Sequence, residues 1–274
     1  MPFVLPALLA VSLHLVTPDT SSPTLATEDT MRTAVPEVLV RAPRITLEEI
    51  LDRVARGEAR RESLLTDQAF TVAVRMTRDV TGKRPPRLIE ESVWRVFRKR
   101  PDKVRSVMLR RVSPEKQKKN RVQVEFSPGM GEEVVHFAFQ PSARRNYRYR
   151  IVGRDLVGNH VIYRIAFEPK SALRAYEPSG VVWIDTNDFV IAREEVRFHQ
   201  SPFPLLLRDI NRMVVERQRV DGHWVLKRVV LRAEMTMPLP RVGSSFDLSV
   251  QYQDYTLNAG LDDALFDHTA GARR

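Results

Sequence analysis

The sequence predicts a mainly β fold: a curved antiparallel sheet or half-open barrel of about 10–11 strands, with an N-terminal amphipathic helix and covering loops or helices. Three observations support this prediction. Apolar residues recur at every second position over most of the chain after residue 60, which is the period of a half-buried strand. Short turn sequences separate these segments, and strands joined by tight turns are antiparallel. A single segment, residues 46–60, shows the helical period instead.

The helix prediction rests on a capping box and on the apolar spacing that follows it. Thr46 offers a hydroxyl at the helix start, and Glu49 offers a carboxylate three residues on. The apolar residues of the segment then follow at helical spacing: Leu47, Ile50, Leu51 and Val54. We expect a polar linker over residues 27–44, one domain over residues 45–267 and a disordered tail over residues 268–274.

The expected strands alternate apolar with polar residues and are separated by turn residues. Gly158-Asn159, Thr186-Asn187-Asp188 and Asp221-Gly222 are typical of hairpin turns. The strands cover residues 70–77, 89–97, 104–112, 121–126 with its continuation 134–139 after a break at 128–131, 147–151, 161–168, 180–185, 189–198, 210–220, 229–237 and 246–252. Because one face of each strand is apolar and the other is charged, the sheet is expected to expose one side to water.

The N-terminal segment indicates an exported protein. Residues 1–16 carry no charge and are rich in Leu, Val and Ala, and a Ser/Thr/Pro stretch then leads to the small residue Ala26. This pattern predicts a signal peptide over residues 1–26, cleaved near Ala26. Its usual basic start is missing, and a short N-terminal anchor is the alternative. Cleavage would remove Asp19 and no basic residue, so that the formal net charge of +10 becomes +11.

The chemistry of enzymes and metal sites has no sequence signature here. The chain has no cysteine, which excludes disulfides, thiolate catalysis and zinc–thiolate sites. Its six histidines form no HExxH motif, and neither a GxSxG motif nor a phosphate-binding glycine loop occurs. We therefore predict no catalytic residue, no metal site and no cofactor. A convergent cluster of distant residues would be needed for a hydrolase that acts on lipid or envelope polymer.

Charged residues are mostly interpreted as the solvated face of the strands. Adjacent carboxylates along a strand point to opposite faces, so pairs such as Glu194-Glu195 cannot share one acid–base site. Glu194 falls on the apolar face and is expected at a wet rim. In residues 144–150, Tyr147 and Tyr149 point one way and Arg148 and Arg150 the other, which argues against a nucleic-acid groove.

One apolar loop interrupts the strand pattern. Residues 202–207 contain two prolines, which exclude a central strand. Consecutive leucines on a surface loop are unfavourable unless they are covered. The segment is a candidate lid across a cavity, or a loop packed on the core, and its apolar residues are Phe203, Leu205, Leu206 and Leu207.

Two stretches resemble the outer-membrane lipoprotein-sorting, or LolA/LolB-like, carriers. Residues 180–185 (GVVWID) are followed by Ile191-Ala-Arg193-Glu-Glu195 in the next strand, and residues 252–261 (YQDYTLNAGL) precede Phe266. The resemblance covers about residues 45–267 in layout, but only these two stretches in residues. It implies a half-open barrel with an apolar concave face and a periplasmic carrier of acyl chains or lipoproteins. Residues 113–133 depart from the family pattern as an inserted loop or hairpin.

Together these observations predict a non-catalytic periplasmic protein that holds a lipid, acyl chain or lipoprotein in an apolar concave cavity. Its partners would be acyl chains, with transient contact to anionic membrane or envelope proteins and no nucleic acid. The alternative is a structural or interaction protein of the cell envelope with a filled core. Strand alternation selects the following residues as the apolar lining: Phe70, Val72, Val74, Met76, Tyr163, Ile165, Phe167, Val229, Leu231, Met235, Phe246, Leu248 and Val250.

Overall fold

The computed structural model describes residues 45–78, 86–113, 138–157, 160–171, 173, 176–201, 204–205, 207–239 and 243–267. The predicted signal peptide, linker, tail and inserted loop lie outside these residues, apart from Ser113. The described helices are α1 (Leu47–Ser63) and the 3₁₀ turns η1 (Arg144–Asn146) and η3 (Asp263–Phe266). The strands are β1 (Asp67–Arg78), β2 (Arg87–Lys99), β3 (Lys103–Val112), β4 (Tyr147–Val157), β5 (His160–Pro169), β6 (Pro178–Asp185), β7 (Val190–Phe198), β8 (Leu207–Val220), β9 (His223–Leu239) and β10 (Gly243–Leu257).

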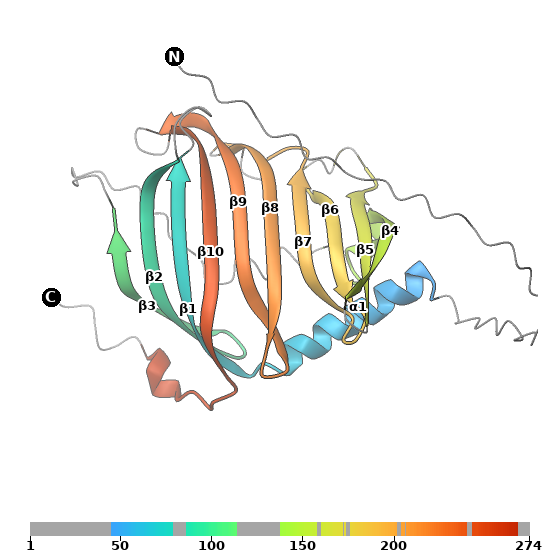
Figure 1. Cartoon of the computed structure of the whole chain (residues 1–274), viewed down its shortest axis with the longest axis horizontal. Helices are drawn as coiled ribbons and strands as arrows, with labels where there is room; N and C mark the ends of the chain where they lie inside the picture. Colours follow the sequence, from blue (N-terminus) through green and yellow to red (C-terminus); the bar gives the residue numbers. More distant parts are fainter. Residues whose placement is uncertain are drawn as a thin grey trace, which may run out of the picture. The chain divides into compact units, whose positions relative to one another are not determined.

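The ten described strands form one antiparallel sheet, as the sequence predicted. Their order is β3-β2-β1-β10-β9-β8-β7-β6-β5-β4, and every neighbouring pair is antiparallel. The sheet is open, with β3 and β4 at its two edges (Figure 1). Of the strand predicted at 134–139, Ala138 and Phe139 lie in a turn, and the rest of it and the predicted strand 121–126 lie outside the described residues.

Helix α1 begins and ends where local chemistry favours it. The Thr46 hydroxyl accepts a hydrogen bond from the Glu49 backbone N–H at 3.2 Å, which caps an otherwise unpaired donor. Acidic residues occupy the first turn and basic residues the last, so both ends complement the helix dipole. The helix reaches Ser63, three residues beyond the predicted end. Its apolar stripe of Ile50, Leu51 and Val54 is buried.

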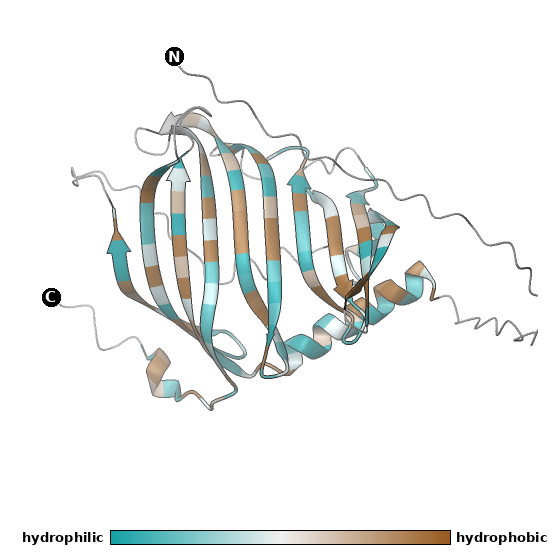
Figure 2. Ribbon diagram, in the orientation of Figure 1, coloured by the Kyte–Doolittle hydropathy of each residue, from teal (hydrophilic) through white to brown (hydrophobic). Residues whose placement is uncertain are grey.

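The side of the sheet that packs against α1 is here called the inner face. Ile50, Leu51 and Val54 belong to the same apolar cluster as alternate residues of the strands. Figure 2 shows hydrophobic and hydrophilic bands alternating along the strands, which reflects this alternation between the two faces. The opposite side, the outer face, carries charged residues at the intervening positions.

Glycine at position 57 permits the close approach of α1 to the sheet. A Cβ at Gly57 would lie 2.4 Å from the Phe189 carbonyl oxygen and 2.5 Å from that of Asp188. These carbonyls belong to the turn between β6 and β7. No side chain larger than hydrogen fits there, although glycine is a poor helix former by about 1 kcal/mol relative to alanine. The contact therefore fixes α1 against the end of the β6–β7 hairpin.

The two stretches that resemble lipoprotein carriers have structural roles. A Cβ at Gly180 would lie 2.0 Å from the Glu195 carbonyl oxygen, so β6 and β7 need glycine at this point. Asn258, at φ 52°, accepts a hydrogen bond from the Thr66 N–H at 2.8 Å and donates one to the Leu64 carbonyl at 2.9 Å. The second stretch thus ties the end of β10 to the segment that joins α1 to β1.

Candidate ligand-binding face

The thirteen predicted lining residues lie on the inner face. Strand register places them in rows across neighbouring strands. One row runs from Val74 of β1 through Val250 of β10 and Val229 of β9 to Val215 of β8. In the other half of the sheet Val182 is opposite Ile165. All thirteen belong to one apolar cluster or pack against it. The sequence pattern therefore identified which residues share this face.

Most of these side chains are buried. Ten of the thirteen are in the buried core, whereas Val74, Leu231 and Met235 are partly buried and pack against it. Beyond the sheet itself, the cluster includes residues of α1 and Phe139, whose ring lies 5.5 Å from that of Phe167. The Tyr149 hydroxyl donates a hydrogen bond to the Ala138 carbonyl and holds this segment in place. Burial also raises the pKa of Tyr149, so this hydroxyl keeps its proton.

A buried charged cluster joins α1 to β7 and β8 on the inner face. Arg217 Nη1 donates to Glu58 Oε1 at 2.7 Å, and Arg61 Nε donates to Glu58 Oε2 at 3.0 Å. The Ile191 backbone N–H also donates to Glu58 Oε1, at 2.8 Å, and Arg217 donates to the Ile191 carbonyl at 3.0 Å. With three donors to its carboxylate, Glu58 is paired in the way a buried charge requires.

Glu194 is a further buried carboxyl, and it interacts electrostatically with Arg217 and Glu58 of this cluster. It lies on the inner face between Val182 of β6 and Val215 of β8, and is 1% exposed. Its Oε2 has no hydrogen-bond partner among the described residues. Burial raises the pKa of Glu194 well above its ordinary value, against the opposing attraction of Arg217. The predicted position at a wet rim is wrong, because β7 lies inside the sheet and α1 packs against it.

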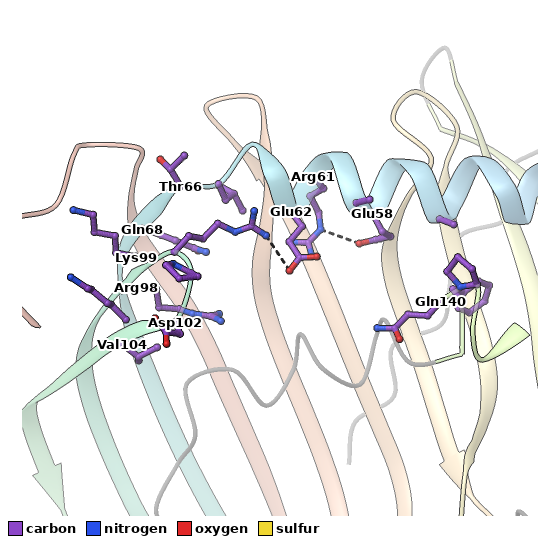
Figure 3. A pocket seen from close by; sticks show the side chains of 18 residues that line it. Glu58, Arg61, Glu62, Thr66, Gln68, Arg98, Lys99, Asp102, Val104 and Gln140 are labelled. Atoms are coloured by element: carbon purple, nitrogen blue, oxygen red, sulfur yellow. Dashed lines mark hydrogen bonds and ion pairs between the residues drawn. The ribbon is translucent and has the colours of Figure 1, made fainter. Parts of the chain in front are cut away.

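A pocket of about 920 Å³ opens where the inner face reaches the surface. Its walls come from the C-terminal half of α1, the start of β1, the hairpin of β2 and β3, and residues 139–141 (Figure 3). Apolar side chains on its wall include Leu65, Val104 and Phe139. Its charged side chains are Glu58, Arg61, Glu62, Arg98, Lys99, Arg100, Asp102 and Lys103. None of the thirteen predicted lining residues is among its walls.

Sequence reasoning missed the charged residues of the inner face. Arg217 follows Met213 and Val215 at strand spacing, and Arg98 follows Trp94 and Val96 in the same way. Glu58 and Arg61 continue the helical face of Ile50 and Val54. The sequence does carry a signal for these buried charges: a charged residue takes the place of an apolar one near the end of an apolar stripe. Such a residue is usually interpreted as lying at the solvent-exposed end of its helix or strand.

The candidate lid lies at the other end of the sheet. The connection from β7 to β8 is at the end opposite to the β6–β7 turn, and hence away from the pocket (Figure 1). Leu205 is 88% exposed, and Leu207 is the first residue of β8 rather than part of a loop. Leu207 pairs with Met235 and packs against the core cluster. Phe203 and Leu206 lie outside the described residues.

Basic residues of the outer face pair with acidic residues across the strands. Glu216 of β8 bonds both Arg193 of β7 and Arg228 of β9, the latter at 3.1 Å. Arg232 and Asp247 pair in the same way at 2.7 Å. This arrangement accords with the interpretation of strand arginines as a solvated face. Tyr147 is buried while Arg148 is exposed, so these neighbouring side chains lie on different faces of β4, as their alternation predicted.

Within the described part of the chain, no group of three or more His, Asp or Glu side chains is placed to hold a metal ion. There is likewise no described helix with the length and apolar character to span a bilayer. His160 lies 3.0 Å from Asp185, but this pair is part of the packing beside the β6–β7 turn. Asp185 also accepts a hydrogen bond from the Asn187 N–H at 2.9 Å.

Comparison with known proteins finds similarity in fold only. No protein-family model matches the chain, and no curated protein matches its sequence. Similar solved structures include a DUF1329 family protein from Desulfovibrio piger, at 16% identity over 80% of this chain and 98% of that chain, with a TM-score of 0.38. A LolA superfamily protein from Nitrosomonas europaea matches at 12% identity over 81% and 97% of the two chains, with a TM-score of 0.36.

A third similar structure is an outer membrane lipoprotein-sorting protein domain from Vibrio parahaemolyticus. It matches at 14% identity over 80% of this chain and 97% of that chain, with a TM-score of 0.38. At these values the similarity concerns the general arrangement of strands and adds nothing about a ligand.

Proposed function

We propose that this protein binds the acyl chain of a lipid or lipoprotein at the inner face and carries it in the periplasm, without catalysis. One observation carries the proposal: an open ten-stranded sheet presents a continuous apolar face whose thirteen predicted lining residues form one cluster. The motif resemblance to lipoprotein carriers supports the same proposal. Residues 1–26 would be the export signal, and residues 45–267 would form the binding domain.

The hydrophobic effect can supply the affinity without any polar motif. Burial gains about 0.8 kcal/mol per CH₂, so a 16-carbon chain gains on the order of 12 kcal/mol. Association and ordering cost several kcal/mol of this sum. Met76 and Met235 belong to the face, and methionine side chains adapt to guests of varied shape. For a guest to enter, partly buried side chains such as Val74, Leu231 and Met235 must move aside.

A second function is favoured by two specific observations. Ten of the thirteen side chains are buried in the structure, as they would be in a filled core. Edge strand β3 also exposes apolar side chains, with Leu109 59% and Met108 43% exposed. An envelope interaction protein that uses this edge would share both features, because an edge strand with exposed apolar side chains is a template for pairing.

Binding of the fluorescent apolar probe N-phenyl-1-naphthylamine separates these functions. We expect saturable binding to the wild-type chain and at least about a tenfold loss in Leu231→Glu, because a carboxylate on the inner face costs several kcal/mol to bury. Val230→Glu places the same group on the next residue, which faces outward, and should bind as the wild type does. Melting temperatures of both variants show whether they remain folded. Absence of probe binding to the wild type would favour the interaction protein.

A further inference from the structure

The pocket at the end of the inner face has more basic than acidic groups on its walls. Five lysine and arginine residues line it, against three acidic residues. Most of these cations have acidic partners: Arg61 pairs with Glu58 at 3.0 Å, and Arg100 pairs with Glu62 at 3.2 Å. Lys99 and Lys103 both contact Asp263, at 2.6 and 3.1 Å. Four of the five lining cations are therefore paired, and the one positive charge that remains favours an anionic guest.

Arg98 is the one of these five lining cations that takes part in none of these ion pairs. Among the described residues, no acidic partner of its guanidinium is found within ion-pair distance. It shares strand parity with Trp94 and Val96, so it faces inward, and it pairs with Gln68 of β1. Both side chains line the pocket (Figure 3). A guanidinium presents donors in a planar fork that fits the oxygens of a phosphate or carboxylate.

The wall beyond Arg98 is apolar. Gln68 is followed on its face by Phe70, and Arg98 is preceded by Val96, and both apolar residues belong to the core cluster. Leu65, Val104 and Phe139 form the apolar part of the pocket itself. A molecule with its anionic group at Arg98 would thus have its apolar part directed along the inner face. The volume of about 920 Å³ falls within the range of pockets that bind small molecules.

We propose that this pocket binds the anionic headgroup of an acyl amphiphile, with Arg98 as the residue that recognises its phosphate or carboxylate group. The inference rests on the proposed acyl-chain binding at the inner face and adds the class of headgroup and the orientation of the guest. The headgroup lies between α1 and the β2–β3 hairpin, and the acyl chain extends toward Phe70 and Val96.

The test compares amphiphiles that share one chain and differ in headgroup charge. Palmitoyl lysophosphatidylglycerol is anionic, palmitoyl lysophosphatidylcholine is zwitterionic, and glycerol 3-phosphate has no chain. Each displaces N-phenyl-1-naphthylamine from the purified chain, below the micellar concentration. We expect the lysophosphatidylglycerol to bind at least about tenfold more tightly than the lysophosphatidylcholine, and glycerol 3-phosphate to bind weakly. If glycerol 3-phosphate binds as tightly as lysophosphatidylglycerol, the acyl chain does not contribute to binding. That result would overturn the proposal that the guest is an amphiphile and would indicate a site for free phosphate.

Variants of Arg98 complete the test. Arg98→Gln should lose the tenfold preference, and its melting temperature shows whether it remains folded, while Arg98→Lys should keep part of the preference because its charge remains. Arg110→Gln is the control, since Arg110 is exposed on β3, pairs with Glu91 and does not line the pocket. If Arg98→Gln keeps the full preference, the headgroup site is wrong while acyl-chain binding survives. If the wild type binds neither the probe nor any amphiphile, the proposed function itself fails.

Discussion

At the scale of single residues, the distinctive feature is the placement of charge inside an apolar face. Glu58 pairs with Arg61 and Arg217, and Glu58 and Arg217 also bond the backbone of Ile191. Removing one member of such a buried set costs about 3–5 kcal/mol, because the other charges then lose their partner. Glu194 differs, since it lies in the same region with an unpartnered oxygen. Its protonation state therefore affects the stability of the inner face directly.

The raised pKa of Glu194 predicts a pH dependence of stability. The folded chain holds this proton over a pH range in which the unfolded chain releases it. The folded state then binds more protons, so the free energy of unfolding falls as pH rises above the ordinary glutamate pKa. Glu194→Gln should remove this fall and raise the melting temperature at neutral pH. Circular dichroism melting curves between about pH 5 and 8 measure both effects.

Glu195 provides the matched control for this experiment. It is the next residue, on the outer face, and the hydrogen bond from Arg193 lowers its pKa. Its contribution to stability is present above the ordinary glutamate pKa and is lost as pH falls through the lowered one. Glu195→Gln should therefore not raise the melting temperature at neutral pH. A pH slope in Glu194→Gln identical to that of the wild type would contradict the role assigned to Glu194.

At the scale of elements, α1 and the sheet were predictable to different degrees. The capping box and apolar spacing located α1, because these signals are local to the helix. Period-2 alternation located the strands and the residues of the inner face, and Asp221 and Gly222 adopt the positive φ angles that a tight hairpin turn requires. The position of Glu194 and the pocket could not be predicted, because both depend on which elements pack over the sheet.

The contact at Gly57 gives a prediction at this scale. Gly57→Ala should destabilise the fold by about 1–3 kcal/mol, because the added methyl group would meet the carbonyls of Asp188 and Phe189. Helix propensity alone would predict the opposite, because alanine stabilises a helix relative to glycine. Chemical denaturation measures the change, and Arg56→Ala on the exposed side of α1 should stay within about 0.5 kcal/mol of the wild type. A more stable Gly57→Ala chain would show that α1 can move away from the β6–β7 turn.

At the scale of the whole molecule, the account concerns a face that is apolar along the sheet and basic at one end. The sequence indicated the apolar face through thirteen residues that the sheet indeed brings together. It did not indicate the basic end, because Arg61 of α1 and Arg98 of the β2–β3 hairpin are far apart in sequence. Strand order decides this proximity: β1 lies between β2 and β10, and its first residues follow directly after α1.

Native mass spectrometry of the protein purified from its own cells without detergent tests the central claim most directly. The account predicts a population heavier than the bare chain, and lipid extraction should identify the difference as one acyl amphiphile per chain with an anionic headgroup. Delipidated protein should regain this mass after incubation with palmitoyl lysophosphatidylglycerol. Recovery of the bare chain alone, both before and after this incubation, would contradict the claim that the inner face admits a guest.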